Sequence, residues 1–176
     1  MKKRSVFAVT LVLLSCVALA GAPDTVHRLK ANLKAVIKTG EVRPVDGITA
    51  AGQPNRAALQ VFANKGYSTV IDLRTEGENR GFREAEFVEK LGMEYIAMPI
   101  DGSEEINFEN ARKLDELIRQ ADGPVLVHCA SSNRVGALLA LRESLNGADD
   151  MSALRFGVEG GVTRLTLRVI DLLEEE

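Results

Sequence analysis

The sequence predicts an α/β fold, with a small, mainly parallel central sheet of four to five strands and helices on both faces. Short apolar runs rich in β-branched residues alternate with amphipathic segments at the spacing of βα units. Right-handed crossovers between parallel strands place the connecting helices over the sheet. Polar clusters follow three of the apolar runs, at the strand ends where such sheets bind ligands.

Each element has its own local signal. The apolar runs predict strands at 47–52, 68–74, 93–100 and 124–129. Apolar residues at helical spacing predict helices at 25–40, 53–66, 82–92, 106–123, 135–145, around Ala153 and at 163–173. Asn55 is a predicted N-cap, and Gly40, Gly66 and Gly147 are predicted stops.

The composition is that of one globular domain. The chain has 176 residues, 45% of them hydrophobic, with 15 glycines and 5 prolines, and no internal repeat or low-complexity linker divides it. The net charge of −3 provides no basic field for nucleic acid and gives no support for a membrane-surface role.

The first 20 residues predict an export signal rather than part of the domain. Three basic residues precede an apolar run, and the sequence Ala-Leu-Ala ends at residue 20, as at a cleavage site. We therefore expect an exported, periplasmic protein whose single domain spans 21–176. Membrane attachment is expected only if Cys16, in the sequence LLSC, is lipidated instead.

Cys129 is the single cysteine of the predicted mature chain, and it stands where a strand turns into a helix. The loop contains Cys129, Ala130, Ser131, Ser132, Asn133 and Arg134. Backbone N–H groups and the helix N-terminus favour negative charge in such a loop and stabilise a thiolate. The two serine hydroxyls are further candidate donors to the sulfur, and the planar guanidinium suits a tetrahedral oxyanion. The loop thus predicts an activated nucleophile facing an anion site.

Four other residues are candidates for supporting or catalytic roles. His128 precedes the thiol and is expected to order the loop by hydrogen bonding. Asp72 and Arg74 end the second strand, where we favour a structural pair over a role in orienting substrate. Asp101 begins the loop after the third strand, at one of the strand ends where ligands bind.

These residues resemble the cysteine-dependent phosphatases, especially their dual-specificity branch. The similarity comprises the strand VLVHC, the loop arginine Arg134, and Asp101 one helix upstream. The segment GITAAGQPN and the strand VIDLR resemble a bacterial subgroup found beside β-lactamase-like hydrolases. The resemblance covers approximately 41–165 and implies a phosphatase-like fold.

The resemblance also implies a mechanism that needs no metal or cofactor. Cys129 would attack phosphorus to give a thiophosphate intermediate, while Arg134 and the loop amides hold the equatorial oxygens. Asp101 would protonate the leaving oxygen and then act as base toward water. The implied substrate is a phosphorylated protein or a small phosphoester.

The loop length leaves two alternatives open. Four residues separate Cys129 from Arg134, one fewer than in the phosphatase signature, and Ser132 stands where that signature has glycine. The shorter length resembles the rhodanese-like sulfurtransferases, which implies a persulfide on Cys129. A non-catalytic anion-binding module is the other alternative.

Overall fold

The computed structural model describes residues 28–175, and its centre is a four-stranded sheet. The strands are β1 (Ile48–Ala51), β2 (Thr69–Asp72), β3 (Glu94–Ala97) and β4 (Val125–His128). They pair in parallel in the order β1-β4-β2-β3, which confirms the predicted fold class. Because β4 lies between β1 and β2, its carboxyl end is flanked by the ends of both neighbours.

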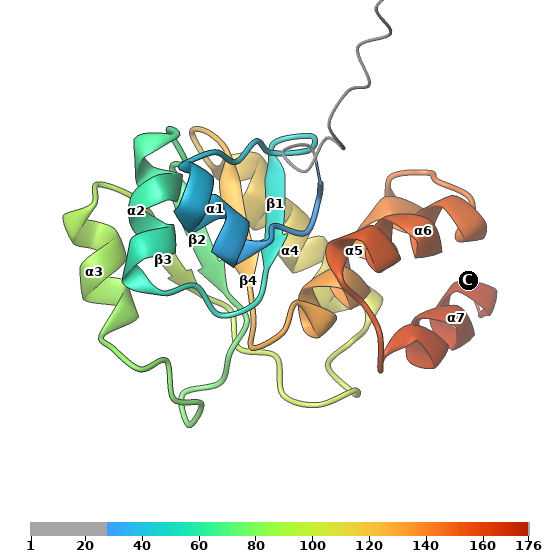
Figure 1. Cartoon of the computed structure of the whole chain (residues 1–176). Coiled ribbons are helices and arrows are strands. Elements are labelled where there is room, and N and C mark those ends of the chain that lie inside the picture. Colours follow the sequence, from blue (N-terminus) through green and yellow to red (C-terminus); the bar gives the residue numbers. More distant parts are fainter. Residues whose placement is uncertain (1–27, 176) are drawn as a thin grey trace, which may run out of the picture.

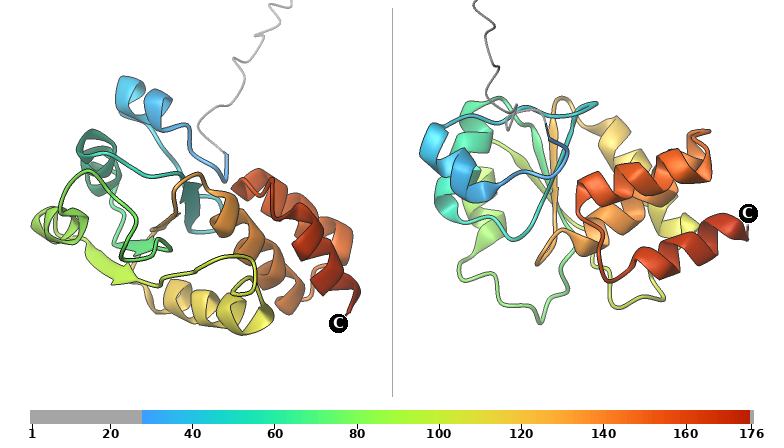
Figure 2. Two further views of the ribbon diagram at one scale, coloured as in Figure 1. Left: turned by 90° about the horizontal axis from the view of Figure 1, so that it is seen from below. Right: turned by 45° about the vertical axis from the view of Figure 1, so that its right-hand side comes forward.

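Helices cover both faces of the sheet (Figures 1 and 2). On one face lie α1 (Leu33–Thr39), α2 (Arg56–Asn64) and α3 (Glu84–Lys90). On the other lie α4 (Phe108–Gln120), α5 (Asn133–Leu145), α6 (Asp150–Gly160) and α7 (Thr166–Glu174). Successive strand residues point to opposite faces of the sheet. Val125 and Val127 of β4 therefore pack in the core under α4 to α7, whereas Leu126 packs in the core under α1 to α3.

The first described helix starts later than the sequence pattern predicts. The predicted helix at 25–40 begins only at Leu33, and its residues 25–27 lie outside the described part of the chain. Asn32 is the N-cap, and its side chain accepts a hydrogen bond from the N–H of Ala35. The preceding residues are extended against the edge strand β1, with the Ala50 N–H donating to Leu29 O at 2.7 Å. Pairing of an exposed sheet edge therefore outweighs helical periodicity here.

Helices α5 and α6 approach each other closely at Gly136. A Cβ atom at Gly136 would lie 2.3 Å from the Val162 nitrogen and 2.4 Å from the Gly157 carbonyl oxygen. These atoms belong to the backbone, so no side-chain rotation can relieve the contact. α5 carries the loop arginine in its first turn, and this packing fixes the position of that turn.

Gly136→Ala is therefore expected to lower the free energy of unfolding by about 3 kcal/mol or more, at the upper end for overpacking. Urea denaturation of purified protein measures the change. Gly77→Ala is the control, because a Cβ there meets no atom within 4 Å. Equal stability of the two variants would show that α5 and α6 are not in close contact.

The predicted export signal, with Cys16, lies outside the described residues and stays a prediction. Among residues 28–175, no helix is long and apolar enough to cross a membrane.

Candidate active site

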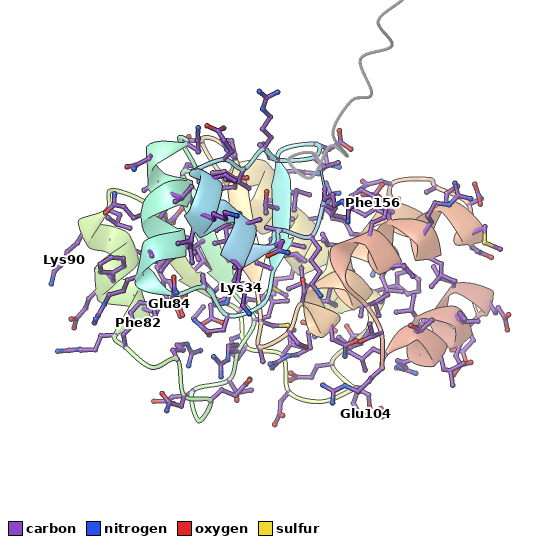
Figure 3. The ribbon with its side chains drawn as sticks, viewed as in Figure 1. Lys34, Phe82, Glu84, Lys90, Glu104 and Phe156 are labelled. Atoms are coloured by element: carbon purple, nitrogen blue, oxygen red, sulfur yellow. The ribbon has the colours of Figure 1, made fainter. Side chains whose placement is uncertain are left out.

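The candidate site is the loop that joins β4 to α5 at the carboxyl edge of the sheet. In Figure 1 this is the lower edge of the sheet, where the loops after β2 and β3 also lie. Figure 3 labels Glu104, which belongs to the loop after β3, at the same edge. Cys129 follows β4 directly and α5 begins at Asn133. The first-turn N–H groups of α5 have no acceptor within the helix, so this end of the helix is suited to bind an anion.

The thiol is held against the sheet by the segment that follows β1. Cys129 is 1% exposed, and its N–H donates to Ala51 O at 3.3 Å. Gln53 N–H donates to Ala130 O at 3.2 Å, so the β1–α2 connection pairs with the loop. Gly52 permits this approach, because a Cβ there would lie 3.1 Å from the same carbonyl oxygen. The GITAAGQPN segment thus holds the backbone of Cys129 and Ala130 in place.

Two side chains of the loop point away from the thiol and into the helical layer. Ser132 is fully buried with φ of 74°, and its hydroxyl donates to Gly160 O at 2.7 Å. The expectation that this hydroxyl donates to the sulfur is therefore wrong. Asn133 accepts a hydrogen bond from the N–H of Thr163 at 2.8 Å. Both residues therefore anchor the loop to its helical support through their side-chain oxygens.

The other loop residues face solvent. Ala130 and Ser131 are exposed at the mouth of the loop. Lys30 donates from Nζ to Ser131 O at 3.1 Å, which adds a positive charge beside the loop.

Arg134 joins the three loops at the carboxyl edge. Its guanidinium makes a two-pronged ion pair with Glu78, with Nη1–Oε1 of 2.7 Å and Nη2–Oε2 of 2.8 Å. Nη1 also donates to Ile100 O at 2.9 Å and to Leu73 O at 3.3 Å. The Glu78 hydrogen bond is the main cause that raises the pKa of Arg134, and the nearby Cys129 sulfur raises it further. Arg134 is thus a permanently charged group beside the thiol.

Glu78 is a site residue that the sequence reasoning missed. It lies in the loop after β2, and its carboxylate pairs with Arg74 at 3.2 Å as well as with Arg134. The signal was present in the Arg74–Glu78 spacing, but a charged residue in TEGENRG has the appearance of a solvated loop residue. The pKa of Glu78 is lowered to about 2, mainly by the Arg134 hydrogen bond, although burial opposes the shift.

Glu78→Gln is expected to remove an acid-sensitive part of the stability. Because the folded pKa is lowered, the ionised carboxylate stabilises the fold above its unfolded pKa of about 4.3, and this contribution is lost as pH falls toward about 2. The contribution is roughly 1 kcal/mol once solvent screening is included. Urea unfolding of both proteins across this range should show curves that differ above about pH 5 and converge near pH 2. Parallel curves at every pH would contradict the ion pair.

The predicted supporting residues belong to a neighbouring polar network. Asp72 is fully buried, and it bonds the backbone N–H of Arg74 at 2.8 Å rather than its guanidinium. Its ion pair is with Arg80, with Nε–Oδ2 of 2.6 Å, and Tyr95 donates to the same oxygen at 2.7 Å. Asp72 and Arg74 are therefore joined through the Arg74 backbone, while their side-chain ion pairs are with other residues. Arg74 instead bonds the Gln53 side-chain oxygen and Glu78.

His128 and Cys129 face opposite sides of the sheet. Cys129 belongs to the core under α4 to α7, whereas the His128 ring approaches Asp72 and Glu84 beside α3. The His128 side chain therefore points away from the thiol loop, contrary to the expectation that it orders the loop by hydrogen bonding.

Asp101 is exposed in the loop after β3, directly after the buried residue Ile100. Its N–H donates to the Glu105 carboxylate, which fixes the start of the loop. Because Arg134 bonds the carbonyl of Ile100, the backbone of Asp101 begins next to the guanidinium. The carboxylate itself faces solvent at the same edge as the thiol.

A strand-loop-helix thiol with an arginine in the first helical turn is the arrangement of the cysteine-dependent phosphatases. The family described as "DSP-PTPase phosphatase fused to NAD+ kinase" matches residues 25–155. The chain belongs to this family.

Curated relatives carry the same domain as part of longer proteins. The beta-lactamase hydrolase-like protein of Xylella fastidiosa (strain Temecula1) is 33% identical over 114 residues, 61% of this chain and 26% of the relative. The protein of the same name from Agrobacterium fabrum is 31% identical over 110 residues, 60% of this chain and 25% of the relative. The chain thus spans about a quarter of the length of these relatives.

Solved structures share the fold at lower identity. The nma1982 protein of Neisseria meningitidis Z2491 has a TM-score of 0.59 at 22% identity, covering 69% of this chain and 89% of that chain. TpbA of P. aeruginosa, crystallised with pTyr, has a TM-score of 0.51 at 19% identity, covering 72% and 83%. At these identities the likeness establishes the phosphatase-like fold of the domain.

Proposed function

We propose that this phosphatase-family domain hydrolyses phosphomonoesters through a thiophosphate intermediate on Cys129. The observation that carries the proposal is the buried thiol at the end of β4, beside the Arg134 guanidinium and the N-terminus of α5. A sulfur placed there is surrounded by a guanidinium and by helix N–H groups, which suits a nucleophile that attacks an anion. The same groups bind the dianionic phosphate that it attacks.

In the first step the Cys129 sulfur attacks phosphorus and the bond to the leaving oxygen breaks. Arg134 and the loop N–H groups neutralise the charge on the equatorial oxygens. Asp101 donates its proton to the leaving oxygen, which departs as an alcohol or phenol. In the second step water attacks phosphorus, Asp101 takes the water proton, and the sulfur–phosphorus bond breaks to restore the thiolate and release phosphate.

The substrate class is a phosphorylated protein or a small phosphoester. The crystallisation of TpbA with pTyr supports phosphotyrosine among these, because the two folds are alike. No nucleic-acid partner is proposed, since the chain carries a net charge of −3.

The short loop supports one alternative, in which Cys129 carries a persulfide sulfur. Parallel assays separate the two, one with an aryl phosphate and one that moves sulfur from thiosulfate to cyanide. The proposal expects phosphate release without sulfur transfer. Sulfur transfer without phosphate release would overturn it, and tight phosphate binding with neither reaction would establish the anion-binding module.

Asp101→Asn is expected to lower kcat about 100-fold with little change in KM, because it removes the proton donor and leaves the phosphate site intact. The loss should be larger for phenyl phosphate than for nitrophenyl phosphate, whose better leaving group needs less protonation. Glu104→Gln, in the same exposed loop, is the control and should retain activity. An equal loss in both variants would contradict the assignment of Asp101 as the acid.

A further inference from the structure

Three buried titratable side chains meet beside the thiol, on the opposite face of the sheet. Asp72 ends β2, His128 ends β4 and Glu84 begins α3, and they are 0%, 0% and 2% exposed. One ligand atom of each lies within 4.8 Å of the other two. The His128 Nε2 is 3.2 Å from Glu84 Oε1 and 3.7 Å from Asp72 Oδ1. The proposed phosphoryl chemistry uses none of these three side chains.

Polar atoms in this cluster lack partners. Within the described part of the chain, Glu84 Oε1 and both ring nitrogens of His128 have no hydrogen-bond partner although they are fully buried. Native proteins pair nearly all such atoms, because an unpaired one has lost its hydration without compensation. An unpaired carboxylate oxygen facing an unpaired imidazole nitrogen therefore indicates a ligand shared between them.

The outer oxygens of the two carboxylates are held by other side chains. Asp72 Oδ2 accepts hydrogen bonds from Arg80 and Tyr95, at 2.6 Å and 2.7 Å. Glu84 Oε2 accepts one from Gln53 Nε2 at 2.8 Å. Glu84 Oε1 is left facing His128, as is Asp72 Oδ1, which also accepts the hydrogen bond from the Arg74 N–H at 2.8 Å. Ligating carboxylates in metal sites are oriented by hydrogen bonds in the same way.

We propose that Asp72, Glu84 and His128 bind a divalent transition metal, with zinc as the representative ion. One imidazole nitrogen and two carboxylate oxygens are ordinary zinc ligands, at about 2.0–2.2 Å from the metal. Ligand atoms at those distances in a tetrahedral site are about 3.3 Å apart, close to the 3.2 Å and 3.7 Å that separate His128 Nε2 from the two carboxylate oxygens. The cation would offset the negative charge of two carboxylates that Arg80 neutralises only in part.

Such an ion would connect β2, β4 and α3 directly behind the nucleophile. Its effect is expected on the stability of the fold and on zinc content. The thiol is not a ligand, because Cys129 belongs to the core of the opposite face. This separates the proposal from the phosphatase chemistry, and each can fail without the other.

The test is calorimetric zinc titration of the untagged, metal-free full chain, made on the wild type and on Cys129→Ser. Both are expected to bind about one zinc per chain and to melt at a higher temperature with zinc present. X-ray absorption of the zinc-loaded wild type should show only nitrogen and oxygen ligands. Absence of binding in both proteins would overturn the site. Sulfur at the zinc, or binding lost in Cys129→Ser, would also overturn it.

Glu84→Gln keeps the shape of the side chain and should bind zinc at least about tenfold more weakly. Glu89→Gln, an exposed position on the same helix, is the matched control and should bind as the wild type does. Equal affinity in all three proteins would overturn the assignment. Circular dichroism checks that Glu84→Gln is folded. If it is not folded, the zinc titrations of the wild type and of Cys129→Ser decide whether the metal site exists.

Discussion

Cys129→Ser is expected to abolish phosphate release, with a fall in kcat on the order of 10⁴ or more, as for the removal of other catalytic nucleophiles. The serine hydroxyl is nearly isosteric with the thiol, but it is not ionised by the surroundings that stabilise a thiolate. Release of phosphate from an aryl phosphate under saturating substrate measures the loss.

The same variant should keep the fold and the anion site, since Cys129 is bonded to the sheet through its backbone. Its circular dichroism spectrum and its affinity for inorganic phosphate are therefore expected to match the wild type. Activity within tenfold of the wild type would show that the thiol is not the nucleophile.

Arg134→Lys is expected to lower kcat on the order of 10³, the range found when a transition-state arginine is lost. The planar guanidinium of Arg134 bonds Glu78 and the carbonyls of Leu73 and Ile100. In the proposed reaction it also stabilises the transferring phosphoryl group, and a lysine ammonium cannot make all of these contacts at once. Steady-state kinetics with the aryl phosphate measure the change.

Arg142→Lys is the matched control, because this arginine lies on the same helix and pairs with Asp115 and Glu143. It is expected to keep kcat within about twofold, since the partners of this half-buried arginine lie on α4 and α5, outside the thiol loop. A similar loss in both variants would indicate a general effect on α5 instead of a contribution from Arg134 to the reaction.

The sheet and the nucleophile loop were predictable because they depend on local patterns. Buried strands end in polar residues, and the βα alternation places those ends on one edge, so Cys129, Arg134 and Asp101 could be assigned to one region of the sheet. The start of the first helix was not predictable in this way. It depends on the pairing of Leu29 and Ala31 with β1, which no local pattern reports.

The partners of the loop were also beyond the sequence. Glu78 and Glu84 have the appearance of surface charges in a polar stretch, yet one pairs with Arg134 and the other lies buried against His128. The direction of Ser132 depends on Gly160, which α6 brings to the loop from a distant part of the chain. Periodicity predicts which face of an element is buried, but tertiary packing decides what each polar side chain contacts.

If Cys129 carries phosphorus during turnover, the phosphoryl group can be identified on the sulfur itself. Wild type and Asp101→Asn are mixed with an aryl phosphate, quenched rapidly in acid and digested, and the Cys129 peptide is analysed by mass spectrometry. We expect a phosphoryl group on Cys129, at higher occupancy in Asp101→Asn if the second step slows more than the first. A peptide that stays unmodified while phosphate is released, or one that gains only sulfur from thiosulfate, would contradict it.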